Sequence, residues 1–337
     1  MTSDYTVLWI DDDKERREEN RGGVGNDERI NVTTLGPMEA ASELLGGANG
    51  EGQIPSDPDL ALVDWYLHTD EYSGDGPSIE GILRDTFQTL PIYAFSGQYG
   101  NPEFEREQKR GEHRFALITS PDRLDDDDLV QDIQDYQQIR SKEGEDIDGI
   151  LELLDAPAEL TEKIRSTLPQ EFTEGLPAED EGDSDSSLRF ARWVRHELLE
   201  TPGLLWDDVW TATKVGIKKE QFTEYSSKLS SAKYTGIFSH RNNLWWRVNV
   251  RDEIYQLADE QDQSVDRLWK SGPGLLDVSE SDRSTCEVDS CDKPHPPQTV
   301  AAGSPSQKPK FQVHYNCSNI EQSRAASYED LRVLVEL

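Results

Sequence analysis

The sequence VLWIDDDKE, residues 7–15, is an apolar run that ends in three consecutive carboxylates. Apolar residues on both faces are typical of a buried strand, whereas adjacent carboxylates repel one another unless they are solvated, partly protonated or bound to a cation. Because the chain contains 68 Asp and Glu against 34 Lys and Arg, three acids in a row are weak evidence by themselves. Their meaning depends on the segments that follow.

Five strand-like apolar runs alternate with helix-like segments in the first 140 residues. A helical pattern follows each run, and Pro37 stands where a helix would begin. This alternation predicts an α/β fold with a doubly wound, five-stranded parallel sheet. The runs are residues 6–10, 30–35, 60–67, 91–95 and 114–118.

Several polar residues follow the strand-like runs, at the edge where a sheet of this kind binds ligands. Asp11, Asp12 and Asp13 end the first run, Asp64 lies in the third, and Ser96 follows the fourth. Carboxylate oxygens are ligands that suit Mg²⁺, so we expect a divalent-cation site at this edge. The alternative for Asp12 and Asp13 is that they cap the helix that follows.

Residues 5 to about 140 resemble the receiver domain of two-component response regulators. In this resemblance, Asp64 in LALVDW matches the phosphoacceptor, and Ser96 in YAFSG matches the hydroxyl residue that contacts the phosphoryl group. Asp11 and Asp12 in WIDDD match the acid pair that binds Mg²⁺, and Tyr66 would add its backbone carbonyl. The resemblance implies a phosphoacceptor for a sensor kinase or another signalling protein, not an enzyme.

Two positions depart from the receiver pattern. The family carries a Lys before a Pro at the end of the fifth strand, whereas this chain has Ser120 before Pro121. The family's switch aromatic falls on Leu117. These departures favour a second reading, in which a non-switching pseudo-receiver acts as an adaptor in protein interactions.

A third reading is enzymatic. Asp11 and Asp13 after an apolar run also resemble the haloacid-dehalogenase-like phosphatases, in which the first Asp is the nucleophile and the second a general acid. Such enzymes need a later acidic pair after a strand, and the run LDDDD at residues 124–128 follows no clear strand. The phosphatase reading also leaves Asp64 unexplained.

The overall charge indicates the environment in which the protein works rather than its activity. A net charge of −34 resembles the acidic proteins of salt-loving archaea. No apolar segment approaches the about 20 residues that span a bilayer, and the first residues lack the pattern of a signal peptide. We therefore expect a cytoplasmic protein without membrane association.

The middle of the chain changes in composition. Residues 141–186 are expected to form a helical connector, broken at Pro157, and an acidic linker. Residues 187–251 then contain 11 Lys and Arg against 6 Asp and Glu, and they hold five of the eight tryptophans. A basic segment in an acidic chain indicates an acidic partner.

Residues 187–260 have the pattern of a winged helix. Three helices precede a strand pair, residues 235–240 and 244–250, and the third helix of such a domain enters the major groove of DNA. This order predicts transcriptional control, in a monomer or a homodimer. The alternative is a small helical domain whose basic face binds a protein. The candidate nucleic-acid contacts are Lys218, Lys219, Gln221, Ser227, Lys228 and, at the tip of the wing, Arg241.

All three cysteines lie near the C-terminal end. The pairs Cys286–Cys291 and His314–Cys317 form a Cys₃His set that suits structural Zn²⁺, with His295 as a spare ligand. Together with a helix expected over residues 319–337, residues 280–337 resemble a treble-clef zinc module. The alternative is that the cysteines are free thiols close together by chance.

Overall fold

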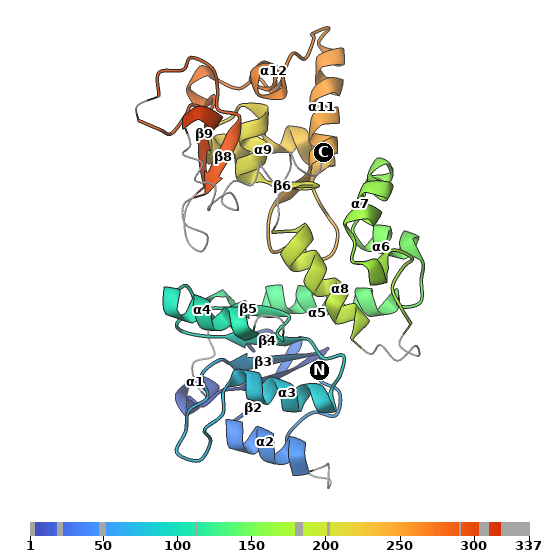
Figure 1. Cartoon of the computed structure of the whole chain (residues 1–337), viewed down its shortest axis with the longest axis vertical. Coiled ribbons are helices and arrows are strands. Elements are labelled where there is room, and N and C mark those ends of the chain that lie inside the picture. Colours follow the sequence, from blue (N-terminus) through green and yellow to red (C-terminus); the bar gives the residue numbers. More distant parts are fainter. Residues whose placement is uncertain are drawn as a thin grey trace. The chain divides into compact units, whose positions relative to one another are not determined.

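The computed structural model describes residues 4–18, 23–46, 52–111, 114–178, 185–200, 203–289, 291–302 and 310–317. They form two compact units (Figure 1). The N-terminal unit comprises Met1–Leu153 and Arg165–Arg192, and the C-terminal unit comprises Leu154–Ile164 and Trp193–Leu337. In the described part of the chain, no helix has the length and apolar character needed to cross a membrane.

A five-stranded parallel sheet forms the centre of the N-terminal unit. Its strand order is β2-β1-β3-β4-β5, and every pairing is parallel. This order is that of the flavodoxin-like α/β fold, to which receiver domains also belong, so the predicted fold of this unit is confirmed. The strands are β1 (Tyr5–Ile10), β2 (Ile30–Leu35), β3 (Leu60–Asp64), β4 (Ile92–Phe95) and β5 (Leu117–Thr119).

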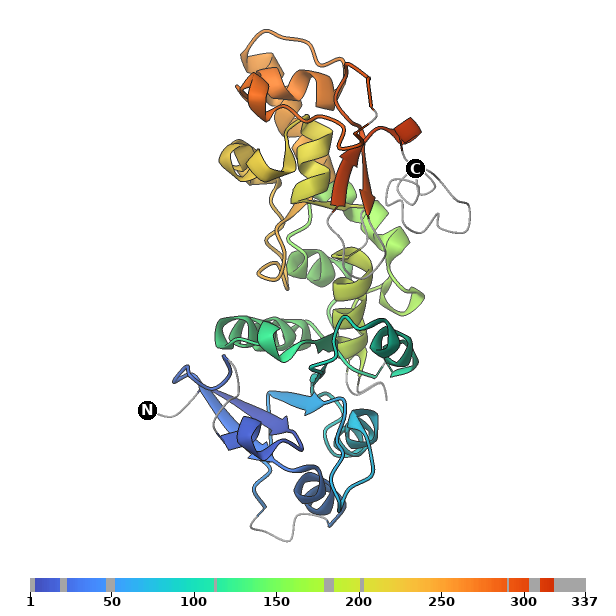
Figure 2. The same cartoon turned by 90° about the vertical axis from the view of Figure 1, so that its left-hand side faces the viewer.

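Helices cover both faces of this sheet, with α2 and α3 on one side and α5 on the other (Figures 1 and 2). Side chains alternate between the faces. Leu8 shares a buried cluster with Ile79 of α3, whereas the ring of Tyr93 lies 6.3 Å from that of Tyr136 in α5. The helices are α1 (Lys14–Glu18), α2 (Pro37–Gly46), α3 (Gly76–Thr86), α4 (Pro102–Gly111) and α5 (Asp126–Ser141).

Short helical segments follow α5. Pro157 separates α6 from the next helical turn because its ring fixes φ and it lacks an N–H donor. Part of the predicted acidic linker, residues 179–184, lies outside the described residues. The segments are α6 (Ile147–Leu153), η2 (Ala158–Leu160), α7 (Thr161–Thr167), η3 (Gln170–Phe172), α8 (Ser186–Trp193) and the π-helical η5 (Val194–Leu198).

The C-terminal unit is built around buried tryptophans. β6 (Leu205–Asp207) pairs with β7 (Leu244–Trp246) in an antiparallel ribbon, with Trp206 opposite Trp245. A hairpin of β8 (Thr299–Ala302) and β9 (Lys310–Val313) adds Val300 to the same buried cluster. Its described helices from β6 onward are α9 (Asp208–Val215), η6 (Lys219–Gln221), α10 (Phe222–Tyr225), η7 (Ser226–Ala232), α11 (Arg247–Glu260), α12 (Leu268–Leu275), η8 (Glu280–Asp282) and η9 (Tyr315–Cys317).

The predicted strand pair of the winged helix is wrong. Residues 235–240 form no strand, and Leu244–Trp246 pairs with β6 instead. The chain then turns into α11, because Val250, Ile254 and Ala258 recur every four residues and are buried together as one helical face. The predicted third helix is also broken, into η6, α10 and η7.

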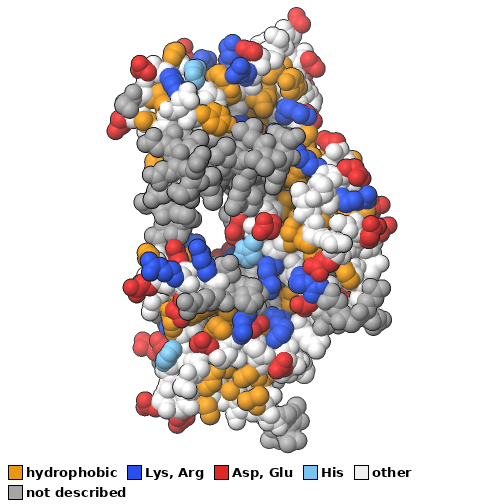
Figure 3. All heavy atoms as spheres, viewed as in Figure 1, with side chains coloured by type: hydrophobic (Ala, Val, Ile, Leu, Met, Phe, Trp, Pro, Cys, Tyr) orange, Lys and Arg blue, Asp and Glu red, His pale blue; other side chains and the backbone are white. Residues whose placement is uncertain are grey.

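Acidic side chains lie on both units on the face shown in Figure 3, in agreement with the acidic composition. Most carboxylates avoid burial because removing a charge from water is costly. Asp11 and Asp64 are exceptions, with exposed fractions of 0% and 6%. Their positions at the ends of strands therefore require a physical explanation.

Replacement of Gly216 by Ala is expected to destabilise the C-terminal unit by about 2 kcal/mol or more. Gly216 ends α9 with a φ of +80°, and an added Cβ would lie 2.3 Å from the carbonyl oxygen of Trp269. Denaturant unfolding monitored by tryptophan fluorescence measures the effect. Gly274→Ala in α12 is the control, because the added Cβ would meet open space. Equal losses in the two variants would contradict this prediction.

Candidate functional site

The sheet brings three predicted metal-ligating residues together. Asp11 and Asp12 follow β1, and Asp64 ends the neighbouring strand β3, where Ile10 lies opposite Val63. One carboxylate oxygen from each acid lies within 4.8 Å of the others. We call Asp11, Asp12 and Asp64 the acidic rim, and the predicted convergence of these residues is confirmed.

Asp11 is held by bonds to both of its oxygens. Oδ1 accepts a hydrogen bond from the backbone N–H of Asp13 (2.9 Å), and Oδ2 accepts one from the indole Nε1 of Trp9 (3.2 Å). Burial raises the pKa of Asp11, while the bond from Asp13 and the charge of Arg16 act in the opposite direction. The side chain is therefore fixed in position.

Asp64 lies beside Asp11 in a similarly buried position. Its Oδ1 accepts a hydrogen bond from the backbone N–H of Tyr66 (3.1 Å). Burial, reinforced by the charge of Asp11, raises the pKa of Asp64 to about 6 against the lowering effects of Tyr66 and Arg16. The carboxyl group therefore gains or loses its proton close to neutral pH.

The other two acids after β1 have local partners. Oδ2 of Asp12 accepts a hydrogen bond from the backbone N–H of His68 (3.0 Å), which ties the loop after β3 to the end of β1. Oδ1 of Asp13 accepts one from the N–H of Arg16 (3.2 Å) at the start of α1. Asp13 thus performs the capping role considered for this pair, while Asp12 belongs to the rim.

The remaining receiver-like positions lie at the expected strand ends. Ser96 is buried directly after β4, and its Oγ accepts a hydrogen bond from the N–H of Gln98 (3.1 Å). Ser120 follows β5 and places a hydroxyl where the receiver family has a Lys. The phenol of Tyr66 donates to Glu107 (2.8 Å), and burial together with that carboxylate raises the pKa of Tyr66 to about 12.

Arg16 is a site residue that the sequence reasoning missed. Its Nη1 lies 2.7 Å from Oδ2 of Asp64 and 3.1 Å from Oδ2 of Asp11. In the sequence it is one of several charged residues in KERREENR, a run typical of a solvated helix. Its position in the sequence could have identified it. A helix that begins at Lys14 places Arg16 in its first turn, and side chains there point back toward the strand end.

The acid run at residues 124–128 has a structural role. Asp125 caps α5 by accepting a hydrogen bond from the N–H of Asp128 (2.9 Å). The carboxylate of Asp126 accepts three hydrogen bonds, from the backbone N–H groups of Gly25, Asn26 and Asp27, at 2.7, 2.8 and 2.7 Å. These bonds hold the loop before β2.

The four predicted zinc ligands form a second cluster. A ligand atom from each of Cys286, Cys291, His314 and Cys317 lies within 4.8 Å of the others. Sγ of Cys291 is 3.2 Å from Nδ1 of His314 and 3.6 Å from Sγ of Cys317, which is 3.8 Å from the same Nδ1. The ligand atoms of tetrahedral zinc are separated by about 3.5 to 3.8 Å, so this spacing fits the ion.

The surroundings of this Cys₃His cluster also suit a metal. Nε2 of His314 bonds to the backbone carbonyl of His295 (2.8 Å), which leaves Nδ1 directed at the sulfurs. Burial lowers the pKa of His314 and favours the neutral ring that metals require. The ring of His295, the spare ligand, is not part of the group. The helix expected over residues 319–337 lies outside the described residues.

Two of the predicted nucleic-acid contacts are engaged within the C-terminal unit. Nζ of Lys219 lies 2.8 Å from Oε2 of Glu287, and Nζ of Lys228 lies 2.9 Å from Oδ2 of Asp277. Residues 218, 221 and 241 are half-buried, and Ser227 is exposed. Because the predicted third helix is broken, the five contacts predicted on it do not form the face of one recognition helix, and Arg241 lies outside the strands rather than at the tip of a wing.

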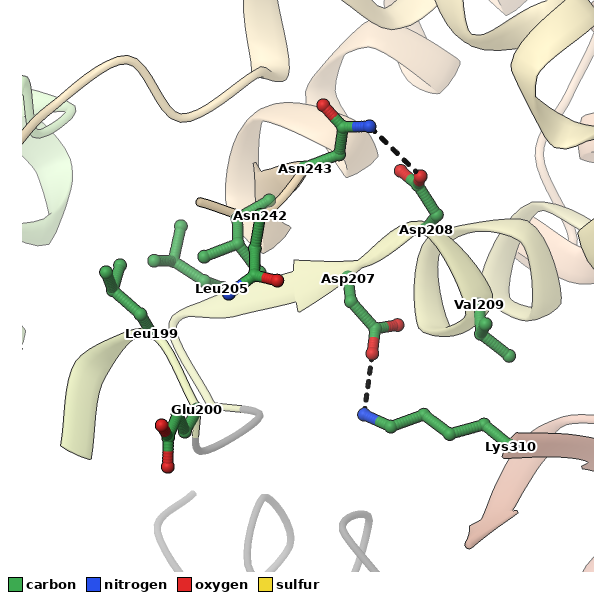
Figure 4. A pocket seen from close by; sticks show the side chains of 10 residues that line it. Leu199, Glu200, Leu205, Asp207, Asp208, Val209, Asn242, Asn243 and Lys310 are labelled. Carbon is green, nitrogen blue, oxygen red and sulfur yellow. Dashed lines mark hydrogen bonds and ion pairs between the residues drawn. The ribbon is translucent and has the colours of Figure 1, made fainter. Parts of the chain in front are cut away.

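A pocket of about 430 Å³ lies at one end of the β6–β7 ribbon (Figure 4). Its polar walls are largely paired with one another. Asp207 forms an ion pair with Lys310 (2.6 Å), and Asp208 accepts hydrogen bonds from Nε1 of Trp245 (2.8 Å) and Nδ2 of Asn243 (3.4 Å). These contacts identify the pocket as part of the packing of the ribbon.

Replacing Asp64 by Asn in magnesium-free buffer is expected to stabilise the N-terminal unit in a pH-dependent way. The folded pKa of about 6 lies above the ordinary value of 3.8, so the carboxyl group contributes most stability below about pH 4 and loses it as the pH rises through about 6. The advantage of Asn should therefore grow by on the order of 2–3 kcal/mol between about pH 4 and pH 7. Urea unfolding of both proteins across this range measures the difference. A difference that does not vary with pH would contradict the assignment.

No model of a protein family matches this sequence, and a search of curated proteins finds no match. Among solved structures, the RcsB response regulator from Salmonella typhimurium matches with 18% identity and a TM-score of 0.28, over 40% of this chain and 60% of that one. A further RcsB structure matches with 14% identity and a TM-score of 0.29, over 83% and 95%. NtrX from Brucella abortus matches with 15% identity and a TM-score of 0.26, over 63% and 46%. The strand order of its sheet identifies the N-terminal unit as a receiver-like, flavodoxin-like α/β fold.

Proposed function

We propose that this protein is a response-regulator-like signalling protein whose phosphoacceptor is Asp64. The observation that supports this most strongly is the acidic rim, where three carboxylates meet beyond the carboxyl ends of parallel strands. Burying carboxylates at such an edge destabilises the fold, so their presence there favours a functional role. A sensor kinase, or another phosphoryl donor, is the proposed input.

The geometry suits a nucleophilic carboxylate. An oxygen of Asp64 would form the new bond to phosphorus while the donor's leaving group departs with the electrons of its own broken bond to phosphorus. Mg²⁺ held by Asp11, Asp12, Asp64 and the carbonyl of Tyr66 would neutralise phosphoryl oxygens. The hydroxyl group of Ser96, at the end of the next strand, would donate a hydrogen bond to the same group.

Acetyl phosphate and Mg²⁺ provide the direct test. The wild type is expected to gain the mass of one phosphoryl group, measured on the intact protein, and Asp64→Asn is expected to gain none. Asp59→Asn is the matched control, because Asp59 precedes β3 at the opposite end and binds the backbone N–H of Thr6 (2.8 Å). It should be phosphorylated like the wild type. No mass gain in any variant, in salt that keeps the protein folded, would contradict the proposal.

Contact with a partner protein is the output that the C-terminal unit supports better than DNA binding. Lys219 and Lys228 already pair with carboxylates of their own unit, which lowers the net positive charge that this surface offers to phosphates. Transcriptional control and a homodimer remain proposals from the sequence. A phosphatase activity has weaker support, because Asp125 and Asp126 hold backbone N–H groups.

We also propose that the C-terminal unit binds one structural Zn²⁺ through Cys286, Cys291, His314 and Cys317. The spacing of the ligand atoms and the bond that orients His314 support this proposal. A site with four protein ligands leaves no open position for substrate, so the role of the ion is to stabilise the fold.

A histidine pair provides a matched test of the zinc site. His314→Asn is expected to abolish the one zinc ion per chain found by elemental mass spectrometry and to lower the melting temperature of the C-terminal unit by several degrees, roughly. His295→Asn removes a neighbouring ring that lies 4.4 Å from that of His314, but it keeps the carbonyl. This control should retain zinc. Zinc loss in His295→Asn with retention in His314→Asn would contradict the assignment.

A further inference from the structure

We propose that Arg16 is a tethered counter-ion that occupies the divalent-cation position of the acidic rim, so that a metal ion binds there only when Arg16 leaves. The inference rests on the proposed receiver-like site and assigns the site a residue that the family resemblance does not. Nη1 of Arg16 contacts Oδ2 of Asp64 (2.7 Å) and Oδ2 of Asp11 (3.1 Å). One nitrogen therefore bridges the two buried carboxylates.

The contacts of the other oxygens explain why this position is shared. Oδ1 of Asp11 is bonded to the N–H of Asp13, and Oδ1 of Asp64 is bonded to the N–H of Tyr66. The two Oδ2 atoms are the ones that face a common cation, and both contact Arg16. Because Mg²⁺ binds its oxygen ligands at about 2.0 to 2.1 Å, the ion and Nη1 exclude one another.

The surroundings allow Arg16, rather than the carboxylates, to move. Its side chain is 28% exposed and its guanidinium group lies 5.8 Å from the centre of the Phe95 ring, at the surface of the strand ends. The side chains of Asp11 and Asp64 are 0% and 8% exposed and continue directly from the sheet. A swing of Arg16 into solvent therefore leaves the core packed, while the carboxylates stay in place to receive an ion.

The sequence also requires a cation at this point. Two neighbouring buried carboxylates without a counter-charge would destabilise the fold, and the end of β5 offers Ser120 in place of a Lys. Arg16 supplies that charge from α1, which begins directly after the acids that follow β1. The resting rim is thus compensated by the chain itself, and metal binding becomes an exchange of one cation for another.

Calorimetric titration with Mg²⁺ of the full, unphosphorylated chain, at fixed salt and with any bound zinc in place, tests this exchange. Arg16→Gln is expected to bind Mg²⁺ at least about tenfold more tightly than the wild type, because no charge-assisted hydrogen bonds have to break first. Arg17→Gln is the matched control. It removes the same charge one residue away, but Arg17 pairs with Glu39 (3.4 Å) rather than with the rim. Its affinity should stay within about twofold of the wild type.

A double variant locates the effect. Adding Asp11→Asn to Arg16→Gln should abolish the gain, because the tighter site would lose a ligand. Equal affinity of Arg16→Gln and the wild type, or an equal gain in Arg17→Gln, would overturn the proposal.

If Arg16→Gln fails to fold without metal, Arg16→Lys is titrated instead. A single ammonium group holds two carboxylates less well, so tighter binding than wild type is expected again. Unchanged affinity would overturn the proposal.

The outcome is independent of phosphorylation. Tighter Mg²⁺ binding by Arg16→Gln in a chain that never accepts a phosphoryl group would support the exchange and refute the proposed phosphoacceptor. Phosphorylation of Asp64 with unchanged Mg²⁺ affinity in Arg16→Gln would support the proposed phosphoacceptor and refute the exchange.

Discussion

The N-terminal unit depends on how it compensates two buried carboxylates at the ends of adjacent strands. Asp11 and Asp64 are almost completely shielded from water, because β1 and β3 hold them at the centre of a parallel sheet. An uncompensated charge in such a position costs several kcal/mol, roughly. Indole and backbone N–H groups and the guanidinium group of Arg16 offset part of this cost, and the raised pKa values of both carboxyl groups reflect the remainder. The proposed cation binding, the proposed phosphoryl transfer and the expected dependence of stability on pH all involve this one arrangement.

The C-terminal unit solves a different problem, because its cysteine-rich segment has little apolar surface of its own. The β8–β9 hairpin places Val300 in the tryptophan core, and Gln312 of β9 donates hydrogen bonds to Thr213 (3.0 Å) and to the carbonyl of Ile217 (2.8 Å). The backbone carbonyl of Gln312 accepts a hydrogen bond from the N–H of Glu287 (3.0 Å). This bond brings the segment of the first ligand pair, Cys286 and Cys291, toward that of His314 and Cys317. The Cys₃His cluster is therefore attached to the tryptophan core by packing and hydrogen bonds of the β8–β9 hairpin.

Local patterns were reliable where one period dominated. The five strands beginning with residues 5–10 were predictable because short apolar runs alternate with helical ones, and the clustering of the four candidate zinc ligands was predictable from their spacing. The strand predicted over residues 244–250 was wrong because LWWRVNV satisfies a strand pattern and also begins a helical one. Its partner strand, β6, lies nearly 40 residues earlier in the chain, so local sequence held no information about that pairing.

Residue types and short-range periods predicted the five strands, the convergence of the carboxylates and the Cys₃His set, and the sequence shows directly that Ser120 rather than Lys precedes Pro121. These follow from residue type and short-range period, which a chain carries before it folds. Only the tertiary structure decided which charges meet. Arg16 and Lys219 belong to similar charged runs, yet one reaches the acidic rim and the other pairs with Glu287. The reason is physical, because a side chain's partner depends on three-dimensional proximity, and long-range packing sets that proximity.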